Sequence, residues 1–293
     1  MPVSGTMRAQ EAHTPQDIPA RGWREVAGRV YEEIGKDRVA AVAAGVTFYG
    51  LLALFPMIGA FVSLYGLVAD PASINAHLAA MSQVLPGGAV EVIGDQVKRI
   101  ASQPGGRLGF SFLAGLAVSL WSANAGVKAM FDALNVAYGV SEKRSFLALN
   151  AQSLAFTLGA MLALAAALLA MVAVPAMLKW AALGEGAEWA LSLARWPLLL
   201  ALVATGLAAL YRYGPCREDV EWAWLTPGAI MASAVWLAAS VAFSWYAANF
   251  GSYNETYGSL GAVIGFMTWM WISATIVLAG AELNAETERV ARA

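Results

Sequence analysis

Four polar residues lie at helical spacing along the end of the second long apolar stretch of this chain and just beyond it. They are Asn124, Lys128, Asp132 and Asn135. Because they lie three or four residues apart, they would share one face of a helix. An ionisable side chain inside a bilayer costs about 2.5–3.5 kcal/mol and usually serves a function. This stripe is therefore a candidate functional site, unless the span ends near Val127 and the charges lie at the cytoplasmic interface.

Polar residues also stand at both ends of the last apolar stretch. Glu255 and Tyr257 precede it, and Glu282 ends it. The first two could line an outer vestibule, or could belong to an interfacial turn that only packs. A glutamate near a helix C-terminus opposes the helix dipole. We therefore expect Glu282 to form an ion pair with Arg212 or Lys128.

Two further positions have a functional and a structural interpretation. Arg212 follows the fourth apolar stretch and could act in the site or anchor the helix at the interface. Pro56 lies inside the first apolar stretch, where a proline removes a backbone donor and kinks a helix. Such a break in a membrane helix can be a hinge or a binding site. It can also be a fixed bend.

Signatures of enzymatic chemistry are missing from the sequence. The chain has one cysteine, Cys216, and two distant histidines, His13 and His77. It contains no phosphate-binding loop, no HExxH motif and no GxSxG motif. We therefore expect no catalytic residues, no metal site, no cofactor and no enzymatic activity.

The composition points to helices that cross a membrane. Hydrophobic residues make up 59% of the 293 residues and charged residues only 13%, whereas soluble domains carry about 25% charged residues. About 20 apolar residues span the hydrocarbon core as a helix. The sequence predicts an all-α, polytopic membrane domain over residues 39–288. Its six expected spans are approximately 39–69, 108–130, 146–178, 196–213, 226–249 and 257–282.

Three segments outside the spans complete the expected organisation. Residues 1–21 have no apolar core and predict a disordered cytoplasmic tail. Residues 22–38 alternate apolar and charged faces, which is typical of an amphipathic interfacial helix. Residues 71–107 predict a helical loop on the outer side. A single charge, Glu255, separates the last two spans, so one re-entrant unit is the alternative to two full spans there.

The distribution of lysine and arginine predicts the orientation. With six spans, 13 of these residues fall on the side of both termini and five on the other side. Because cytoplasmic loops carry the excess of positive charge, both termini are expected in the cytoplasm.

Several motifs together resemble the YihY/BrkB family of bacterial inner-membrane proteins. They are Ala43-Ala-Gly-Val-Thr-Phe-Tyr49, Tyr211-Arg-Tyr-Gly-Pro215, Tyr253-Asn-Glu-Thr-Tyr-Gly-Ser-Leu-Gly261 and Gly280-Ala-Glu-Leu-Asn284. The resemblance implies six spans and a bacterial cytoplasmic-membrane location. Members are described as transporters or as virulence factors. Some carry the label ribonuclease BN, which is regarded as a misassignment.

The expected function is therefore that of a secondary-transporter-like or lipid-handling membrane protein. Its expected partners are the lipid bilayer and a lipid-like or amphiphilic substrate, and no nucleic acid is expected. The sequence is compatible with an oligomer. A non-transporting envelope scaffold associated with virulence is the alternative. A membrane-bound ribonuclease is the last choice. The sequence does not name the substrate or a coupling ion.

Overall fold

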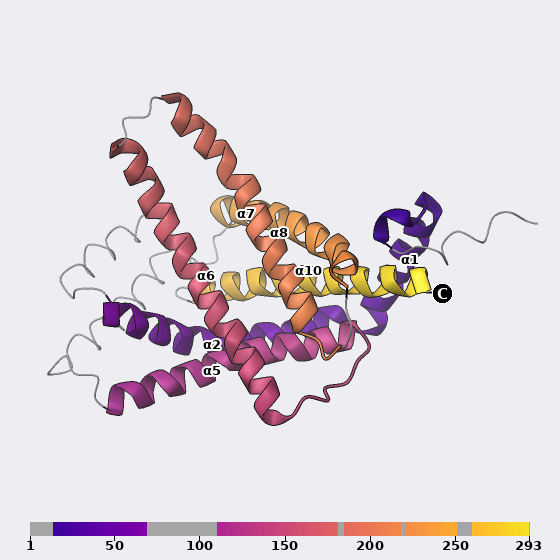
Figure 1. Cartoon of the computed structure of the whole chain (residues 1–293), viewed down its shortest axis with the longest axis horizontal. Helices are drawn as coiled ribbons and strands as arrows, with labels where there is room; N and C mark the ends of the chain where they lie inside the picture. Colours follow the sequence, from indigo (N-terminus) through magenta and orange to yellow (C-terminus); the bar gives the residue numbers. More distant parts are fainter. Residues whose placement is uncertain (1–13, 69–109, 181–184, 218–220, 251–259, 293) are drawn as a thin grey trace, which may run out of the picture. The chain divides into compact units, whose positions relative to one another are not determined.

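The computed structural model describes residues 14–68, 110–180, 185–217, 221–250 and 260–292. These residues contain seven α-helices and one short 3-10 helix, and no strand (Figure 1). The expected all-α class is confirmed for this part of the chain. The elements are η1 (Pro15–Asp17), α1 (Ala20–Lys36), α2 (Val39–Val68), α5 (Phe110–Ala137), α6 (Phe146–Trp180), α7 (Glu185–Tyr213), α8 (Trp222–Phe250) and α10 (Leu260–Arg292).

Three of the described helices contain segments long and apolar enough to cross a membrane. These segments are Phe146–Ala163, Trp222–Tyr246 and Val263–Ala291. A fourth follows if the bent pair Ala20–Lys36 and Val39–Leu54 counts as one span, and Pro197–Tyr213 is a shorter apolar helix. The described part of the chain therefore has several membrane-crossing helices.

The helices extend beyond the uncharged stretches. Helix α5 continues to Ala137, although the second span was expected to end at residue 130. Helix α10 likewise continues to Arg292, past residue 282. An uncharged stretch marks the part of a helix that fits the hydrocarbon core, whereas backbone hydrogen bonds continue a helix wherever charged side chains reach water. The expected outer loop, residues 71–107, lies outside the described residues.

The described part of the chain begins at Thr14, before the expected boundary at residue 21. Thr14 and Asp17 close a 3-10 turn, in which the Thr14 backbone N–H and hydroxyl both donate to Asp17 Oδ2 at 2.9 Å. Ile18 follows with 4% of its surface exposed and packs with Trp224 and Ala291. Residues 14–21 therefore belong to the fold, which corrects the prediction of a disordered tail for this stretch. The apolar side chain of Ile18 is the physical reason.

The chain forms two compact units. The larger unit contains residues 1–47, 130–146 and 165–293, and the smaller unit contains residues 48–129 and 147–164. In the larger unit, helix α8 packs against α7 and α10, and α1 packs against α10. Its apolar core joins the first turns of α2, the last turns of α5 and parts of α7, α8 and α10.

Glycines allow the closest helix contact in the larger unit. A Cβ atom on Gly228 of α8 would overlap the carbonyl oxygen of Gly280 on α10. A Cβ on Gly280 would in turn lie 2.8 Å from Ala232 Cβ and 2.9 Å from the Gly228 oxygen. Small residues at membrane helix contacts let the backbones approach in this way. In the smaller unit, Gly126 of α5 plays the same part against Gly50 and Ala53 of α2.

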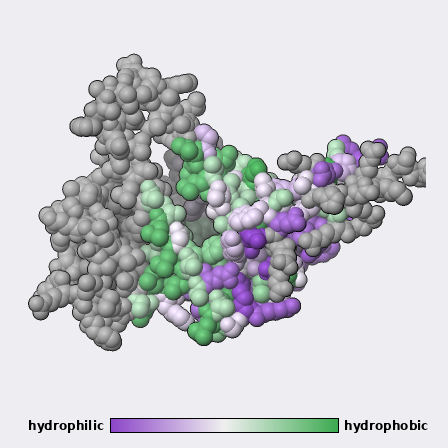
Figure 2. All heavy atoms as spheres, in the orientation of Figure 1, coloured by the Kyte–Doolittle hydropathy of each residue, from purple (hydrophilic) through white to green (hydrophobic). Residues whose placement is uncertain are grey.

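The described surface carries many large apolar side chains, as the hydropathy colouring shows (Figure 2). Leu162 is 71% exposed, Leu198 66%, Val241 55% and Trp245 62%. Soluble monomers rarely leave large contiguous apolar areas uncovered. This exterior therefore fits contact with lipid tails.

Candidate functional site

Glu282 occupies an unusual position in the larger unit. Its exposed fraction is 0%, and neither carboxylate oxygen has a hydrogen-bond partner among the described residues. The expected ion pair with Arg212 is therefore not formed. The charged groups that act on Glu282 are Asp37 and Glu33 from the end of α1 and Arg289 from α10 itself. A buried ionisable group without a partner is costly and marks a candidate site.

The corner between α1 and α2 brings Asp37 to this place. Asp37 is the C-cap of α1, and its backbone N–H donates to the Glu33 oxygen at 2.8 Å. Arg38 follows with φ of 50°, a left-handed conformation that non-glycine residues seldom adopt. The two helices bend by 60° there. The bend thus lies at Asp37–Arg38, whereas α2 runs as one helix through Pro56, whose role as a hinge stays a prediction.

Asn284, one turn beyond Gly280, ties α10 to two other segments. Its Oδ1 accepts a hydrogen bond from the backbone N–H of Gly228 at 2.8 Å. Its Nδ2 donates to the hydroxyl of Tyr138 at 3.4 Å. The hydroxyl of Tyr211 on α7 donates to the carbonyl oxygen of Val277 on α10 at 2.8 Å. Because these groups are buried, each bond satisfies a polar atom that would otherwise lack a partner.

Asn135 has a structural role at the end of α5. Its Oδ1 accepts the backbone N–H of Cys216 at 2.7 Å, and its Nδ2 donates to Glu142 at 3.2 Å. Arg144 pairs with Glu142 at 2.5 Å and donates to the carbonyl oxygen of Gly214 at 2.9 Å. The hydrogen bonds from Arg144 lower the pKa of Glu142 to about 2. These residues join the loop after α5 to the end of α7.

Asp132 and Arg212 also have local electrostatic partners in the larger unit. The pKa of Arg144 is raised chiefly by its hydrogen bonds to Glu142, and the negative charge of Asp132 adds to this effect. Arg212 has Nε and Nη1 buried without hydrogen-bond partners, and its guanidinium carbon lies 5.7 Å from the ring centre of Tyr213 and 5.2 Å from that of Trp222. Cation–π contacts of this kind favour the interpretation of Arg212 as an anchor.

A small polar cavity of about 170 Å³ lies near the end of α10. Its lining includes Tyr138, Arg217, Glu288 and Arg289. Arg217 forms an ion pair with Glu288 and lies 4.3 Å above the Tyr138 ring. Neither Arg217 nor Glu288 was predicted from the sequence. The only signal for Glu288 was its place among acidic residues after the last apolar stretch.

In the smaller unit, polar residues of α5 and α6 meet inside the apolar helices. The Lys128 ammonium donates to Asn150 Oδ1 at 3.0 Å and lies 5.0 Å from the Trp121 ring centre. One turn earlier, Asn124 Oδ1 accepts the Thr157 hydroxyl at 3.2 Å. Asn124 and Thr157 are 1% and 2% exposed. We call Asn124, Lys128, Asn150 and Thr157 the Lys128 cluster.

The two members of this cluster on α6 were not predicted from the sequence. Asn150 and Thr157 lie seven residues apart in an otherwise uncharged stretch, with Ser153 between them. That helical spacing was the available signal. Glu255 and Tyr257, the remaining predicted residues, lie outside the described residues. Within the described part of the chain, no three His, Cys, Asp or Glu side chains are grouped so that they could hold a metal ion.

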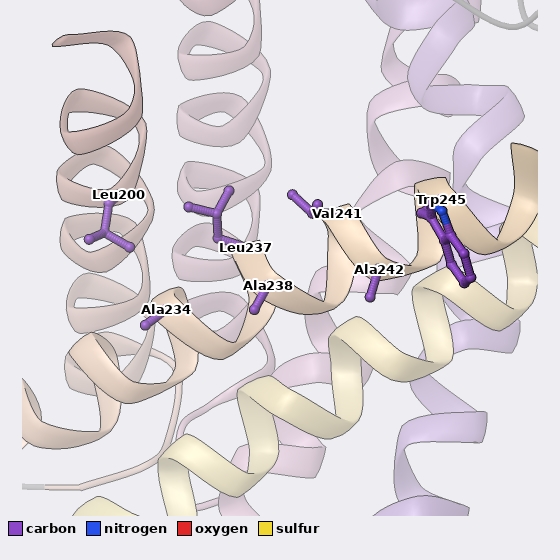
Figure 3. A pocket seen from close by; sticks show the side chains of 7 residues that line it. All are labelled: Leu200, Ala234, Leu237, Ala238, Val241, Ala242 and Trp245. Atoms are coloured by element: carbon purple, nitrogen blue, oxygen red, sulfur yellow. The ribbon is translucent and has the colours of Figure 1, made fainter. Parts of the chain in front are cut away.

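An apolar groove of about 740 Å³ runs along α8 in the larger unit. Figure 3 shows its lining side chains: Leu200 from α7, and Ala234, Leu237, Ala238, Val241, Ala242 and Trp245 from α8. The groove has no charged side chain in its lining. It suits a hydrocarbon chain.

The model of the family described as virulence factor BrkB matches residues 30–293. The chain belongs to the BrkB family. Together with its apolar helices, this membership makes it a multi-pass membrane protein, and the resemblance inferred from the motifs is confirmed.

Individual proteins similar to this chain include membrane proteins of several bacteria. The ribonuclease-like protein YfkH of Bacillus subtilis is 31% identical over 253 residues, which cover 83% of this chain and 88% of YfkH. A UPF0761 membrane protein of Azoarcus is 26% identical over 272 residues, covering 91% of this chain and 64% of the relative. The matches thus cover less than two thirds of the UPF0761 proteins. No solved structure matches the chain significantly.

Proposed function

We propose that this BrkB-family protein is a secondary-transporter-like protein that handles a lipid-like or amphiphilic substrate. The observation that carries the proposal is the Lys128 cluster. A lysine on a membrane helix is costly and is seldom present without a task. Its amide and ring partners carry no compensating negative charge. The ammonium therefore remains available to an anionic group, such as a phosphate or carboxylate headgroup.

The proposed arrangement has six spans, formed by α2, α5, α6, α7, α8 and α10. Each of these helices has 28 or more residues, which exceeds the roughly 20 residues needed to span the hydrocarbon core. The excess of lysine and arginine supports cytoplasmic termini in the bacterial cytoplasmic membrane. The apolar groove supports an amphiphile, because it offers a place for a hydrocarbon chain.

Cysteine accessibility in lipid nanodiscs tests the proposal. On a Cys216→Ser background, we would introduce Asn124→Cys and Lys128→Cys and apply a membrane-impermeant thiol reagent. The background is suitable because Asn135 is bound by the backbone N–H of Cys216 and not by its thiol. Leu162→Cys is the control, since Leu162 is an exposed apolar position of the same unit. Labelling at 124 and 128 but not at 162 supports a water-filled substrate path.

The second candidate is a scaffold that organises other envelope proteins without transport. The close glycine contacts of Gly228 with Gly280 and of Gly126 with Gly50 favour it, because they describe tightly packed helices. This candidate predicts that Asn124→Cys and Lys128→Cys both resist labelling and that a partner co-purifies stably. A ribonuclease, which the name of YfkH would suggest, ranks last because the described residues offer no group of three metal-ligating side chains.

A further inference from the structure

Glu282 is a buried acidic residue without an ion-pair partner among the described residues of the larger unit. Its carboxyl group is fully buried, and both oxygens lack hydrogen-bond partners among the described residues. An isolated buried carboxylate ion costs far more than a neutral carboxylic acid. The other two buried glutamates on the same helix show the usual solution: Glu286 pairs with Arg289, and Glu288 pairs with Arg217.

The surroundings of Glu282 do not offer such a cation. Asp37 and Glu33 face it from the end of α1, so its strongest charged neighbours include two carboxylates. Arg289 acts on it from α10, but Arg289 is engaged by Glu286. Lys36 is bound to Glu33 at 2.7 Å and points to the exposed side of α1.

The other helices that reach this end of α10 bring groups that are engaged elsewhere. Tyr138 after α5 accepts from Asn284, and Tyr211 on α7 donates to the Val277 oxygen. Arg217 after α7 is held by Glu288. Helix α8 presents the Gly228 backbone, which binds Asn284. Glu282 thus lacks a hydrogen-bond partner among the described residues, and its acidic neighbours are Asp37 and Glu33.

We infer that Glu282 and Asp37 form a proton-binding site that holds one proton between α10 and the corner of α1 and α2. Two neighbouring carboxyl groups, of which Glu282 is fully buried and Asp37 half-buried, cannot both ionise easily. One proton makes Glu282 neutral and supplies the O–H donor that the site lacks. The inference does not depend on the transport proposed above, because it concerns only the larger unit.

The geometry gives the proton a structural consequence. Asp37 caps α1 and is followed by Arg38 in its left-handed conformation, where the chain bends by 60°. Loss of the proton places two negative charges across the contact between this corner and α10. Repulsion between them would push the corner away from α10. The protonated site therefore stabilises the contact between the end of α1 and α10.

Infrared difference spectroscopy of the full chain in nanodiscs, titrated with acid and base, tests the site. A protonated carboxylic acid has a carbonyl band that a carboxylate lacks. We expect this band in the wild type at neutral pH, its disappearance as the pH rises, and its absence in Glu282→Gln. The matched control is Glu286→Gln, which removes another buried glutamate of α10 that is already ion-paired and so should leave the band unchanged.

A second variant keeps the test decisive if Glu282→Gln does not fold. Asp37→Asn removes the nearest like charge from an accessible corner, and it should lower the proton affinity of Glu282 by about tenfold or more. The inference is overturned if the wild type shows no protonated carboxyl band at neutral pH. It is also overturned if Asp37→Asn leaves the titration unchanged, or if sodium or potassium at constant pH removes the band, since the last result would indicate a cation site.

Discussion

The side chain of Asn284 on α10 accepts a hydrogen bond from the backbone of Gly228 on α8, with a distance of 2.8 Å between Asn284 Oδ1 and the Gly228 nitrogen. Gly228 follows Pro227, which has no backbone N–H to donate. The asparagine thus binds the backbone donor next to a proline that lies inside helix α8. Because Gly228 also admits the Gly280 oxygen, one short stretch of α8 provides both a hydrogen bond and the closest helix contact.

Replacing Asn284 should therefore destabilise the larger unit. Asn284→Ala removes the side-chain acceptor of the buried Gly228 N–H and takes a donor from the Tyr138 hydroxyl. An unsatisfied buried polar group costs about 1–3 kcal/mol. Thermal unfolding in detergent should show a lower Tm than for Thr268→Ala, a control on the same helix whose exposed hydroxyl only binds its own backbone. Equal Tm values would contradict the assigned role.

The contact between Gly228 and Gly280 should tolerate no larger side chain at position 228. In Gly228→Ala the new Cβ would overlap the Gly280 oxygen, so α8 and α10 must separate. Overpacking of this kind typically costs about 1–3 kcal/mol. The control is Gly265→Ala on α10, where a Cβ meets nothing within 4 Å and where alanine favours the helix. We expect reduced yield and Tm for Gly228→Ala alone. A loss of the same size in both variants would count against the contact.

The loop after α5 should show a characteristic acid sensitivity. Arg144 lowers the pKa of Glu142 to about 2, below its ordinary value of 4.5. A group with a lowered folded-state pKa stabilises the fold above its unfolded pKa and loses that contribution as the pH falls through the folded value. The contribution of Glu142 is therefore present at neutral pH and is lost between about pH 4.5 and 2.

Measurement of Tm as a function of pH checks this prediction. Glu142→Gln should have a lower Tm than the wild type at neutral pH, and the difference should shrink as the pH approaches 2. Glu25→Gln is the control, because Glu25 forms an exposed ion pair with Arg29 on α1, and exposed pairs contribute little. A Tm difference for Glu142→Gln that does not change with pH would exclude the proposed ion pair as its cause.

The sequence predicts the helices better than it predicts the partners of their polar residues. Hydropathy follows local composition, so the uncharged stretches correspond to long helices. The partner of Asn135 is the backbone of Cys216, 81 residues away, and periodicity carries no information about such a pair. The ion pair expected for Glu282 was wrong for the same reason. The helix dipole favoured a nearby cation, but the fold places the carboxylate of Asp37 near Glu282. The prediction that Asn124 to Asn135 lie on one helix is confirmed, but these side chains contact different partners.

The charge of Lys128 should matter for function and little for stability. Lys128→Met keeps the apolar stem and removes a partly buried charge. Such a replacement is often neutral or stabilising, so the Tm should stay equal or rise. Asn124→Cys lies one turn away, and its labelling should prefer an anionic thiol reagent over a cationic one as long as the ammonium is present.

In the double variant with Lys128→Met, the preference of Asn124→Cys for the anionic reagent should fall several-fold. Lys143→Met is the matched control, because Lys143 is an exposed lysine outside the Lys128 cluster. A preference that survives Lys128→Met would mean that the ammonium does not face the aqueous path. A preference that disappears while the Tm holds would identify Lys128 as the residue that attracts an anionic substrate group.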